Sequence, residues 1–276
     1  MGKRRIGLVC GVWVFVLLVA VFSVVLNVRL VKGNSGTIYI RADGSIDPPT
    51  ALISSVDNVT YVFTGNTYDS IVVERDNIVV DGADWTVQGT GNATGIDLSG
   101  RNNVTLKNAK VQSFEKGVYL GYSAHCIISN NVIRNNRDGI TITSAEKAII
   151  EKCEISDCSE SGIALLGEND VLIKENTIER NKNGIATDKS GTHSGILIVD
   201  NNILSNQENG IYLYSYSSVY MFGTGRGYIY NVTISSNTIS SNGENGIYLN
   251  SEGNGYEGFF WAIGDAYIYN ITVSSN

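Results

Sequence analysis

Arginine and carboxylate side chains gather at one predicted turn, and they are the residues of this chain best suited to acid–base or cation chemistry. Arg134, Arg137 and Asp138 are nearly adjacent, and Arg180 follows at a similar place about two repeats later. Such a cluster could take part in a reaction or help to hold a cation such as calcium. Charged residues on a solvated turn usually do neither, and we favour that interpretation. Arg134, Arg137 and Asp138 are the catalytic candidates, without an assigned role.

Two other kinds of chemistry lack a recognisable set of residues. Inverting glycoside hydrolysis needs opposed carboxylates about 6.5–9.5 Å apart. Glu154 and Glu179 lie about one repeat apart near the same turn, a pattern too general to identify them. The residues that could bind a transition metal form no cluster: His125, His193, Met1 and Met221. The sequence therefore predicts no cofactor and no metal site, although the acidic surface could hold calcium.

Aromatic residues are the strongest candidates for binding, and they gather in two glycine-rich insertions that we predict to be loops, at 214–230 and 250–269. Rings on exposed loops can stack on sugar faces, and they also dominate protein contacts. The alternative is that the rings pack against the body of the protein or against a partner. The candidate ligand-binding residues are Tyr214, Tyr216, Tyr220, Phe222, Tyr228, Tyr256, Phe259, Phe260, Trp261 and Tyr267.

A short repeated phrase positions these residues. Glycine followed by an apolar residue recurs at Gly95, Gly117, Gly139, Gly162, Gly184, Gly210 and Gly246. The first four intervals are 22, 22, 23 and 22 residues, and the last two are 26 and 36. In the two long intervals, all but one of the added residues fall between the Gly phrase and the next repeat's first asparagine. A repeat of this length indicates a solenoid, and insertions on one side of a solenoid often build its binding face.

Two further sequence motifs recur in phase with the Gly phrase. Asn-x-Ile-x-x-Asn begins at Asn131, Asn176, Asn201 and Asn237, and an apolar-x-apolar piece precedes it, as in Val104-Thr105-Leu106. Three short pieces of period 2 in each coil of about 22 residues predict an all-β, right-handed parallel β-helix. We expect the asparagines to stack at one bend, with asparagine and glycine supplying left-handed backbone. A leucine-rich-repeat horseshoe would need a Leu-x-x-Leu-x-Leu phrase and a helix, and neither is present.

The amino-terminal segment is a separate unit. Basic residues at positions 3–5 precede an uncharged, mostly apolar run over residues 6–28, followed by Arg29 and Lys32. Twenty-three residues are long enough to cross a bilayer core of about 30 Å as a helix. No small-x-small cleavage site fits before Gly33, so we predict an uncleaved anchor rather than a signal peptide. The basic amino end favours an extracellular location for the remainder.

The charge of the remainder excludes one class of partner. After residue 32 the chain carries 15 basic and 27 acidic residues, a net charge of −12 that would repel phosphate backbones, so nucleic acid is not expected. In an exported chain five Asn-x-Thr sequons become predicted glycosylation sites: Asn58, Asn92, Asn103, Asn231 and Asn270.

The cysteines do not form a disulfide framework. Cys153 and Cys158 occupy both asparagine positions of a single coil. An extracellular disulfide could close that bend. The favoured alternative is two thiols that act as small fillers, because a spacing of five residues across a bend can hold the Cα atoms too far apart.

The chain resembles a known group of proteins at residues 36–44 (Gly-Thr-Ile-Tyr-Ile-Arg-Ala-Asp-Gly), at 76–82 (Asp-Asn-Ile-Val-Val-Asp-Gly) and in the Gly-Ile phrases. It is similar to secreted archaeal right-handed β-helix proteins of the NosD type and, more distantly, to the pectate-lyase-like superfamily. That resemblance implies a polysaccharide lyase, hydrolase or epimerase, a copper-site accessory protein, or a surface protein without a reaction. An arginine base beside calcium ligands would suit the lyase. The Asp-Pro-His-Asp signature of the epimerases is absent.

The sequence thus predicts three regions: an anchor or signal over residues 1–35, a strand or capping region over 36–70, and the β-helix over 71–276. Since Val273-Ser274-Ser275-Asn276 repeats Ile234-Ser235-Ser236-Asn237, we expect further coils after the last residue. The expected function is an extracellular, membrane-anchored binding scaffold that contacts polysaccharide. The alternatives are a polysaccharide-processing enzyme and a structural envelope or adhesion protein.

Overall fold

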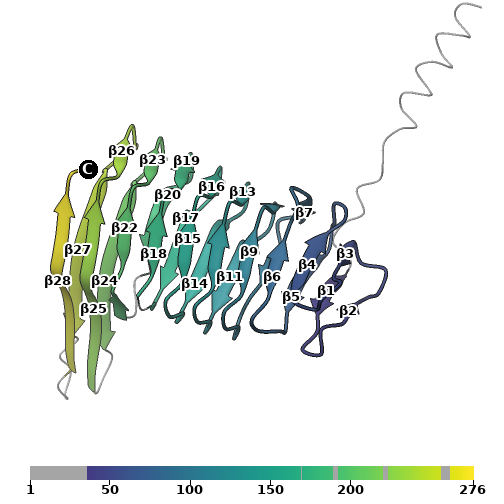
Figure 1. The fold of residues 1–276 in the computed structure, drawn as a ribbon. Helices are drawn as coiled ribbons and strands as arrows, with labels where there is room; N and C mark the ends of the chain where they lie inside the picture. The colour runs from purple at the N-terminus through teal and green to yellow at the C-terminus, as the bar shows by residue number, and fades with distance from the viewer. Residues whose placement is uncertain (1–35, 169, 189–191, 220–222, 256–261) are drawn as a thin grey trace, which may run out of the picture. The chain divides into compact units, whose positions relative to one another are not determined.

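Half of the strands that the structure describes are three residues long, and a typical one points its central side chain inward. In Thr105-Leu106-Lys107, Leu106 is fully buried while its two neighbours are half-buried. A computed structural model describes residues 36–168, 170–188, 192–219, 223–255 and 262–276. Residues 34–276 form one unit, and its strands build a parallel β-helix of three sheets (Figure 1).

Sheet A contains the strand that follows each Gly phrase. In order along the sheet its strands are β2 (Ile46–Asp47), β1 (Thr37–Ile40), β5 (Ser70–Val73), β8 (Thr94–Asp97), β11 (Lys116–Gly121), β14 (Asp138–Thr143), β17 (Ser161–Leu166), β20 (Asn183–Thr187), β24 (Ile211–Val219) and β27 (Ile247–Gly255). All pair in parallel except β1 with β2, so β2 turns back at the amino-terminal end of the sheet.

Sheet B contains the apolar-x-apolar pieces that precede the asparagines. Its strands are β3 (Ile53–Ser54), β4 (Thr60–Phe63), β6 (Val79–Asp81), β9 (Thr105–Lys107), β12 (Ile127–Ser129), β15 (Ile149–Glu151), β18 (Leu172–Lys174), β22 (Leu197–Val199), β25 (Gly223–Ser235) and β21 (Thr192–Ser194), and β28 (Ala262–Ser274) pairs with β25.

Sheet C contains the Asn-x-Ile pieces. Its strands are β7 (Thr86–Gln88), β10 (Lys110–Gln112), β13 (Val132–Arg134), β16 (Glu154–Ser156), β19 (Thr177–Glu179), β23 (Asn202–Leu204) and β26 (Thr238–Ser240). The chain passes from sheet A to B to C and back to A, as three short strands per coil predict.

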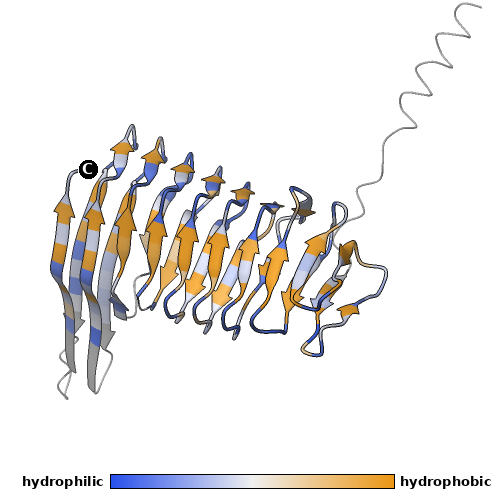
Figure 2. Cartoon of the chain, viewed as in Figure 1, coloured by the Kyte–Doolittle hydropathy of each residue, from blue (hydrophilic) through white to orange (hydrophobic). Residues whose placement is uncertain are grey.

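The core consists of columns of identical or similar side chains. In sheet B one column runs in register through Leu106, Ile128, Ile150, Ile173, Ile198 and Ile234, all fully buried. Each such side chain contributes roughly 1.5–3 kcal/mol through burial. Apolar residues follow the strands and hydrophilic ones the turns (Figure 2). Because every coil repeats the same inward positions, the sequence phrase alone determines the stacking register.

The bend between sheets B and C holds an asparagine ladder. The side chain of Asn176 donates to the backbone oxygen of Ile150 (2.9 Å) and to Oδ1 of Asn201 (3.0 Å). The expected left-handed backbone lies one residue earlier, because Glu175 and Asp200 have φ of 55° and 56°. The ladder asparagines are therefore required for their amides, not for their backbone conformation.

The repeated glycines also serve a different purpose from the one expected. A Cβ at Gly139 would lie 2.5 Å from the backbone oxygen of Gly162, and one at Gly184 would lie 2.4 Å from that of Gly210. Neither glycine has a positive φ in the left-handed range. Glycine is needed here because adjacent coils approach too closely for any side chain.

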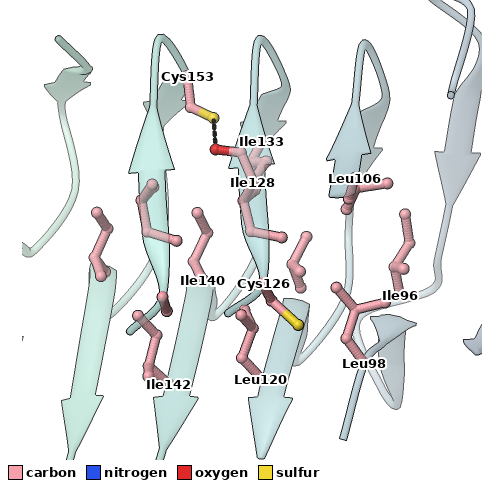
Figure 3. Close-up of a cluster of buried hydrophobic side chains, with 14 of the residues drawn as sticks. Ile96, Leu98, Leu106, Leu120, Cys126, Ile128, Ile133, Ile140, Ile142 and Cys153 are labelled. Atoms are coloured by element: carbon pink, nitrogen blue, oxygen red, sulfur yellow. Dashed lines mark hydrogen bonds between the residues drawn. The ribbon is translucent and has the colours of Figure 1, made fainter. Parts of the chain in front are cut away.

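The cysteines are fillers rather than a disulfide. Cys126, Cys153 and Cys158 are free thiols buried in the core, and the Cys153 thiol lies 3.5 Å from the backbone oxygen of Ile128 (Figure 3). The bends at Cys153 and Cys158, which lie on either side of β16, are therefore closed without a covalent bond.

The insertions predicted as loops are largely strand. β24 and β27 pair over nine residues, and β25 pairs with β28 from Gly223 to Ser235, well beyond the ends of neighbouring strands (Figure 1). The loop prediction for 214–230 and 250–269 is therefore wrong over these ranges. Their glycines and tyrosines continue the parallel pairing instead of breaking it. Residues 220–222 and 256–261 lie outside the described residues.

In the part of the chain that the structure describes, no helix is long and apolar enough to cross a membrane. The predicted anchor, residues 6–28, lies outside that part.

Candidate functional site

A hollow of about 310 Å³ lies on the outer face of sheet A, over β11, β14, β17 and β20. Its lining residues are Lys116, Arg137, Asp138, Thr141, Glu160, Ser161, Ala164, Leu166, Ala186, Thr187 and Asp188. We call this hollow the sheet A groove.

The floor of the groove is a break in a column of large side chains. The outward column of sheet A reads, in register, Tyr119, Thr141, Ala164, Ala186, Tyr212 and Tyr248. Strands are spaced about 4.8 Å apart, so the two flanking tyrosines stand about 19 Å apart. Three small residues between them leave the space that the groove occupies.

The tyrosines on the far side of the break form a ladder. The rings of Tyr212 and Tyr248 lie 5.1 Å apart with only 4° between their planes, so they stack face to face along the solenoid. Tyr212 packs next to Ala186 in the register, where the next ring of the ladder is missing. The register therefore leaves the position next to Tyr212, at Ala186, without a ring.

One polar end of the groove contains Asp138. Its carboxylate accepts a hydrogen bond from the backbone N–H of Ser161 (3.1 Å), and burial raises its pKa above the usual range. Nearby cations already have partners. Lys116 Nζ lies 4.3 Å from the centre of the Tyr119 ring, and Arg137 pairs with Glu115 (3.2 Å).

A hydroxyl group on the floor lacks a partner among the described residues. Thr141 is 1% exposed, and its Oγ1 makes no hydrogen bond. Leaving a buried hydroxyl unpaired costs about 1–3 kcal/mol. A ligand or water in the groove would remove that cost.

The other polar end contains Asp188, which lies beside a buried histidine. Asp188 Oδ1 lies 3.1 Å from His193 Nε2, and His193 Nδ1 lies 3.1 Å from Glu168 Oε1. Glu168 is fully buried, His193 is 1% exposed, and the side chain of Asp188 is 31% exposed. Burial lowers the pKa of His193, but the two carboxylates more than offset it and raise the pKa to about 9. The imidazole is therefore a cation at neutral pH.

The family is decided by comparison with known proteins. Residues 69–224 match the family model described as a right-handed beta helix region, which covers more than half of the chain. The chain belongs to the right-handed β-helix family. No match was found among curated proteins.

In this right-handed β-helix the predicted catalytic residues are separated by the turn between β13 on sheet C and β14 on sheet A. Arg137 and Asp138 line the sheet A groove. Arg134 lies at the end of β13 and lines a different hollow, on sheet C, together with Arg180 and Asp157. Arg180 pairs with Asp157 there (2.9 Å), and Arg134 donates to Gln112 (2.9 Å). The structure therefore does not bring the three together as one site.

The predicted aromatic binding residues of the β-helix lie on two sheets where they are described. Tyr214 and Tyr216 are on sheet A with rings 6.3 Å apart, and Tyr214 is only 8% exposed because it packs against its neighbours and donates to Glu252 (2.7 Å). Tyr228 and Tyr267 stack on the outside of sheet B, 5.8 Å apart. The other six lie outside the described residues: Tyr220, Phe222, Tyr256, Phe259, Phe260 and Trp261.

A second stack on sheet B was not among the predicted binding residues. Tyr230 and Tyr269 lie 5.2 Å apart with 3° between their planes, beside the Tyr228 and Tyr267 pair. About half of the surface of Tyr267 and Tyr269 is exposed. The sequence did contain a signal for this stack. The Tyr-Ile-Tyr motif recurs in β25 and β28, and its alternation places two outward rings in each strand.

Sequence reasoning also missed Glu168 and His193. Counting back four residues from the paired Leu172 and Leu197 places both in one inward column. The same count gives Arg75 and Arg101, both half-buried, in two earlier coils and Ser123, Ala145, Ile229 and Ile268 in the coils nearer to this pair. Two consecutive ionisable residues in an inward column are the signal that could have revealed them.

The remaining predictions concern metals and glycans. Among the described residues no group of three His, Cys, Asp or Glu side chains could hold a metal ion. Calcium at the acidic surface stays a prediction. The five sequon asparagines are all exposed: Asn58, Asn92, Asn103, Asn231 and Asn270. Glycosylation requires that exposure, and it too stays a prediction.

Proposed function

We propose that this right-handed β-helix is a polysaccharide-binding scaffold of the cell surface and that the sheet A groove is its binding site. The observation that carries the proposal is the break in the tyrosine ladder. Tyr212 has a ring against Tyr248 on one side and only Ala186 in the register on the other. A sugar ring over Ala186 would continue the stack, since sugar faces pack well against aromatic rings.

The rest of the groove supports a sugar ligand. The unpartnered Thr141 hydroxyl can both donate and accept, as sugar hydroxyls require. Carboxylates at both ends, Asp138 and Asp188, can accept hydrogen bonds from sugar hydroxyls. Small apolar residues with a few convergent polar groups are typical of ligand sites.

The location follows from the amino-terminal segment. We propose that residues 6–28 anchor the chain in a membrane and that the β-helix lies outside the cell, where polysaccharide is available. Fractionation of cells that express the full chain or a variant lacking residues 6–28 tests this. Release of only the shortened chain supports the anchor, and equal membrane recovery of both chains contradicts it.

A polysaccharide-processing enzyme is the second candidate, and one observation favours it. Asp138 lines the groove with a pKa raised by burial, and such a carboxyl can serve as a general acid. A purely structural role is the third candidate and predicts no sugar binding at all.

The test is electrophoresis of the full chain through native gels cast with single polysaccharides. Ala186→Tyr adds the missing ring of the ladder and fills the place proposed for the sugar. Thr105→Tyr is the matched control, because it adds a ring to the outward face of sheet B instead. We expect retardation of the wild type and of Thr105→Tyr, and its loss in Ala186→Tyr. Clearing of the polymer around the band would establish an enzyme, and unchanged mobility in every gel would overturn the proposal.

A further inference from the structure

The outer face of sheet B carries a row of aliphatic side chains. Four successive coils place a large aliphatic residue at the first outward position of their sheet B strand, in register: Ile127, Ile149, Leu172 and Leu197. The first three are half-buried, and Leu197 is 37% exposed. In the strands that the structure describes, no outward column of sheet A or C repeats such residues over four coils. We call these four residues the sheet B stripe.

The fold does not require aliphatic residues in the stripe. The coils on either side have threonine at the same position, Thr105 before the stripe and Thr233 after it, and both threonines pair in the same register. Threonine in the stripe would pair in the same way and would expose less apolar surface. Four neighbouring aliphatic side chains on an outer face therefore indicate a surface that another molecule covers.

Predicted glycosylation sites lie beyond both ends of the stripe. At four of the five sequons the asparagine has left-handed backbone, and the threonine two residues later is the first outward residue of a sheet B strand: Asn58, Asn103, Asn231 and Asn270. In the four coils of the stripe, the same turn position holds a residue other than asparagine: His125, Lys147, Asp170 and Gly195. Glycans at the four sites would therefore leave the stripe uncovered between them.

The charges on the outer face of the sheet B strands balance, although the chain is acidic. The acids are Asp81, Glu151 and Asp265, and the bases are Lys107, Lys174 and Arg226. Beside the stripe, Lys174 pairs with Glu151 (3.0 Å), and Lys107 pairs with Asp81 (3.2 Å). Two copies of a chain with a net charge of −12 after residue 32 repel each other over most of their surface. The strands of sheet B add nothing to that repulsion.

The spacing of the stripe matches a second copy of this chain. Neighbouring stripe residues stand one strand spacing apart, about 4.8 Å, and another copy presents the same straight row at the same interval. A two-fold axis parallel to the stripe places each stripe residue opposite its own counterpart. This is the self-complementary arrangement of a symmetric dimer. A globular partner without this repeat would match only part of the row.

We propose that the sheet B stripe is the face through which two copies of this chain associate. Four coils offer a small footprint, so the association should be weak and concentration-dependent, with a dissociation constant in the micromolar range. The sheet A groove lies on the outer face of another sheet. The inference therefore goes beyond the proposed binding function and does not depend on it.

The chain itself supplies variants that should keep the fold. Leu172→Thr installs the residue that Thr105 and Thr233 provide in other coils, and Leu172→Lys places a charge within the stripe. Thr177→Lys is the matched control, because Thr177 is the first outward residue of the sheet C strand in the same coil. Circular dichroism and thermal unfolding of each full-length variant verify the fold before association is measured.

The test is sedimentation equilibrium of the full chain in detergent micelles, from about 1 to 100 µM. The wild type and Thr177→Lys should show the same monomer–dimer equilibrium. Leu172→Thr should weaken it about three- to tenfold, and Leu172→Lys at least about tenfold, because the two-fold axis brings two like charges together. All variants keep residues 6–28, so association through that segment cannot cause a difference between them. A monomeric wild type at the highest concentration, or equal dimerisation of Leu172→Lys, would overturn the proposal.

Cross-linking tests the symmetry of the dimer. In a Cys10→Ser background the remaining cysteines are buried free thiols, and Leu172→Cys adds an accessible one. A short bismaleimide should join two copies of the Leu172→Cys variant and should not join copies of Thr177→Cys. Cross-linking of Thr177→Cys alone, or of neither variant at concentrations where the wild type is dimeric, would place the contact elsewhere and overturn the proposal.

Discussion

Glu168 and His193 occupy successive coils of one inward column, with the carboxylate oxygens 3.1 and 3.2 Å from imidazole Nδ1. On its other side the imidazole faces Asp188, at the surface of the sheet A groove. A buried charge thus connects the core of the solenoid to the outer face of sheet A, where the column of tyrosines is interrupted. The stability and the binding properties of this protein should therefore depend on the same three residues.

Replacing His193 alone should be costly. His193→Ile leaves the fully buried Glu168 without its cation, and breaking a buried pair typically costs about 3–5 kcal/mol. The double variant Glu168→Ala, His193→Ile should recover most of the loss, because it restores the apolar column of adjacent coils. Denaturant unfolding of the two variants measures this. Equal stability of the single variant and the wild type would show that the pair does not form.

Stability should fall as the solution becomes alkaline. The folded pKa of His193 is raised from 6.5 to about 9, so the stabilisation is complete below pH 6.5 and is lost as pH rises through 9. The loss should amount to about 3 kcal/mol. Unfolding at pH 6 and pH 10 measures it, with the double variant as a control that should lack this contribution. An NMR titration in a His125→Gln background that gives an ordinary histidine pKa would contradict the account.

Restoring the asparagine ladder should stabilise the protein. Asn131 Nδ2 lies 4.0 Å from the Cys153 sulfur, a poor substitute for the 3.0 Å contact between Asn176 and Asn201. Cys153→Asn should add about 1 kcal/mol and raise the unfolding temperature by about 2–4 °C. Cys153→Ala, which adds no hydrogen bond, is the matched control and should lower it. A lower unfolding temperature in Cys153→Asn would mean that the amide does not fit this coil.

The core thiols should be unreactive until the protein unfolds. Burial raises the pKa of Cys153 to about 11 and that of Cys158 to about 12, and both are 1% exposed. A thiolate is the reactive species, so neither should react at pH 8. In a Cys10→Ser background a thiol reagent should label the chain only in denaturant. Rapid labelling of the native protein would show that these coils open.

The fold could be predicted from the sequence because each coil repeats the same pattern of inward apolar positions. A column such as Leu106, Ile128 and Ile150 needs only an alternating phrase at a fixed interval, and that phrase is visible without a structure. The function of Gly139 was harder to foresee, since close approach of coils depends on three-dimensional packing. The extended strands β24 and β25 were mistaken for loops because pairing with the next coil outweighs local glycine content.

The site could be predicted only in part. Asp138 and Arg137 were singled out from their types, but their separation from Arg134 depends on which side of a turn each side chain leaves. The groove itself is defined by small residues, Ala164 and Ala186, whose importance lies in what is missing between Tyr119 and Tyr212. No sequence motif marks a position where the side chains are merely small. The register of the strands was needed to reveal it.

The central claim is that a sugar ring continues the tyrosine ladder above Ala186. Isothermal titration of the full chain with a soluble oligosaccharide from a polymer that retards it tests this directly, for the wild type and for Ala186→Tyr. The account predicts that the added ring lowers affinity at least about tenfold while the thermal stability is kept. An affinity unchanged by Ala186→Tyr in a folded protein would place the sugar elsewhere and contradict the account.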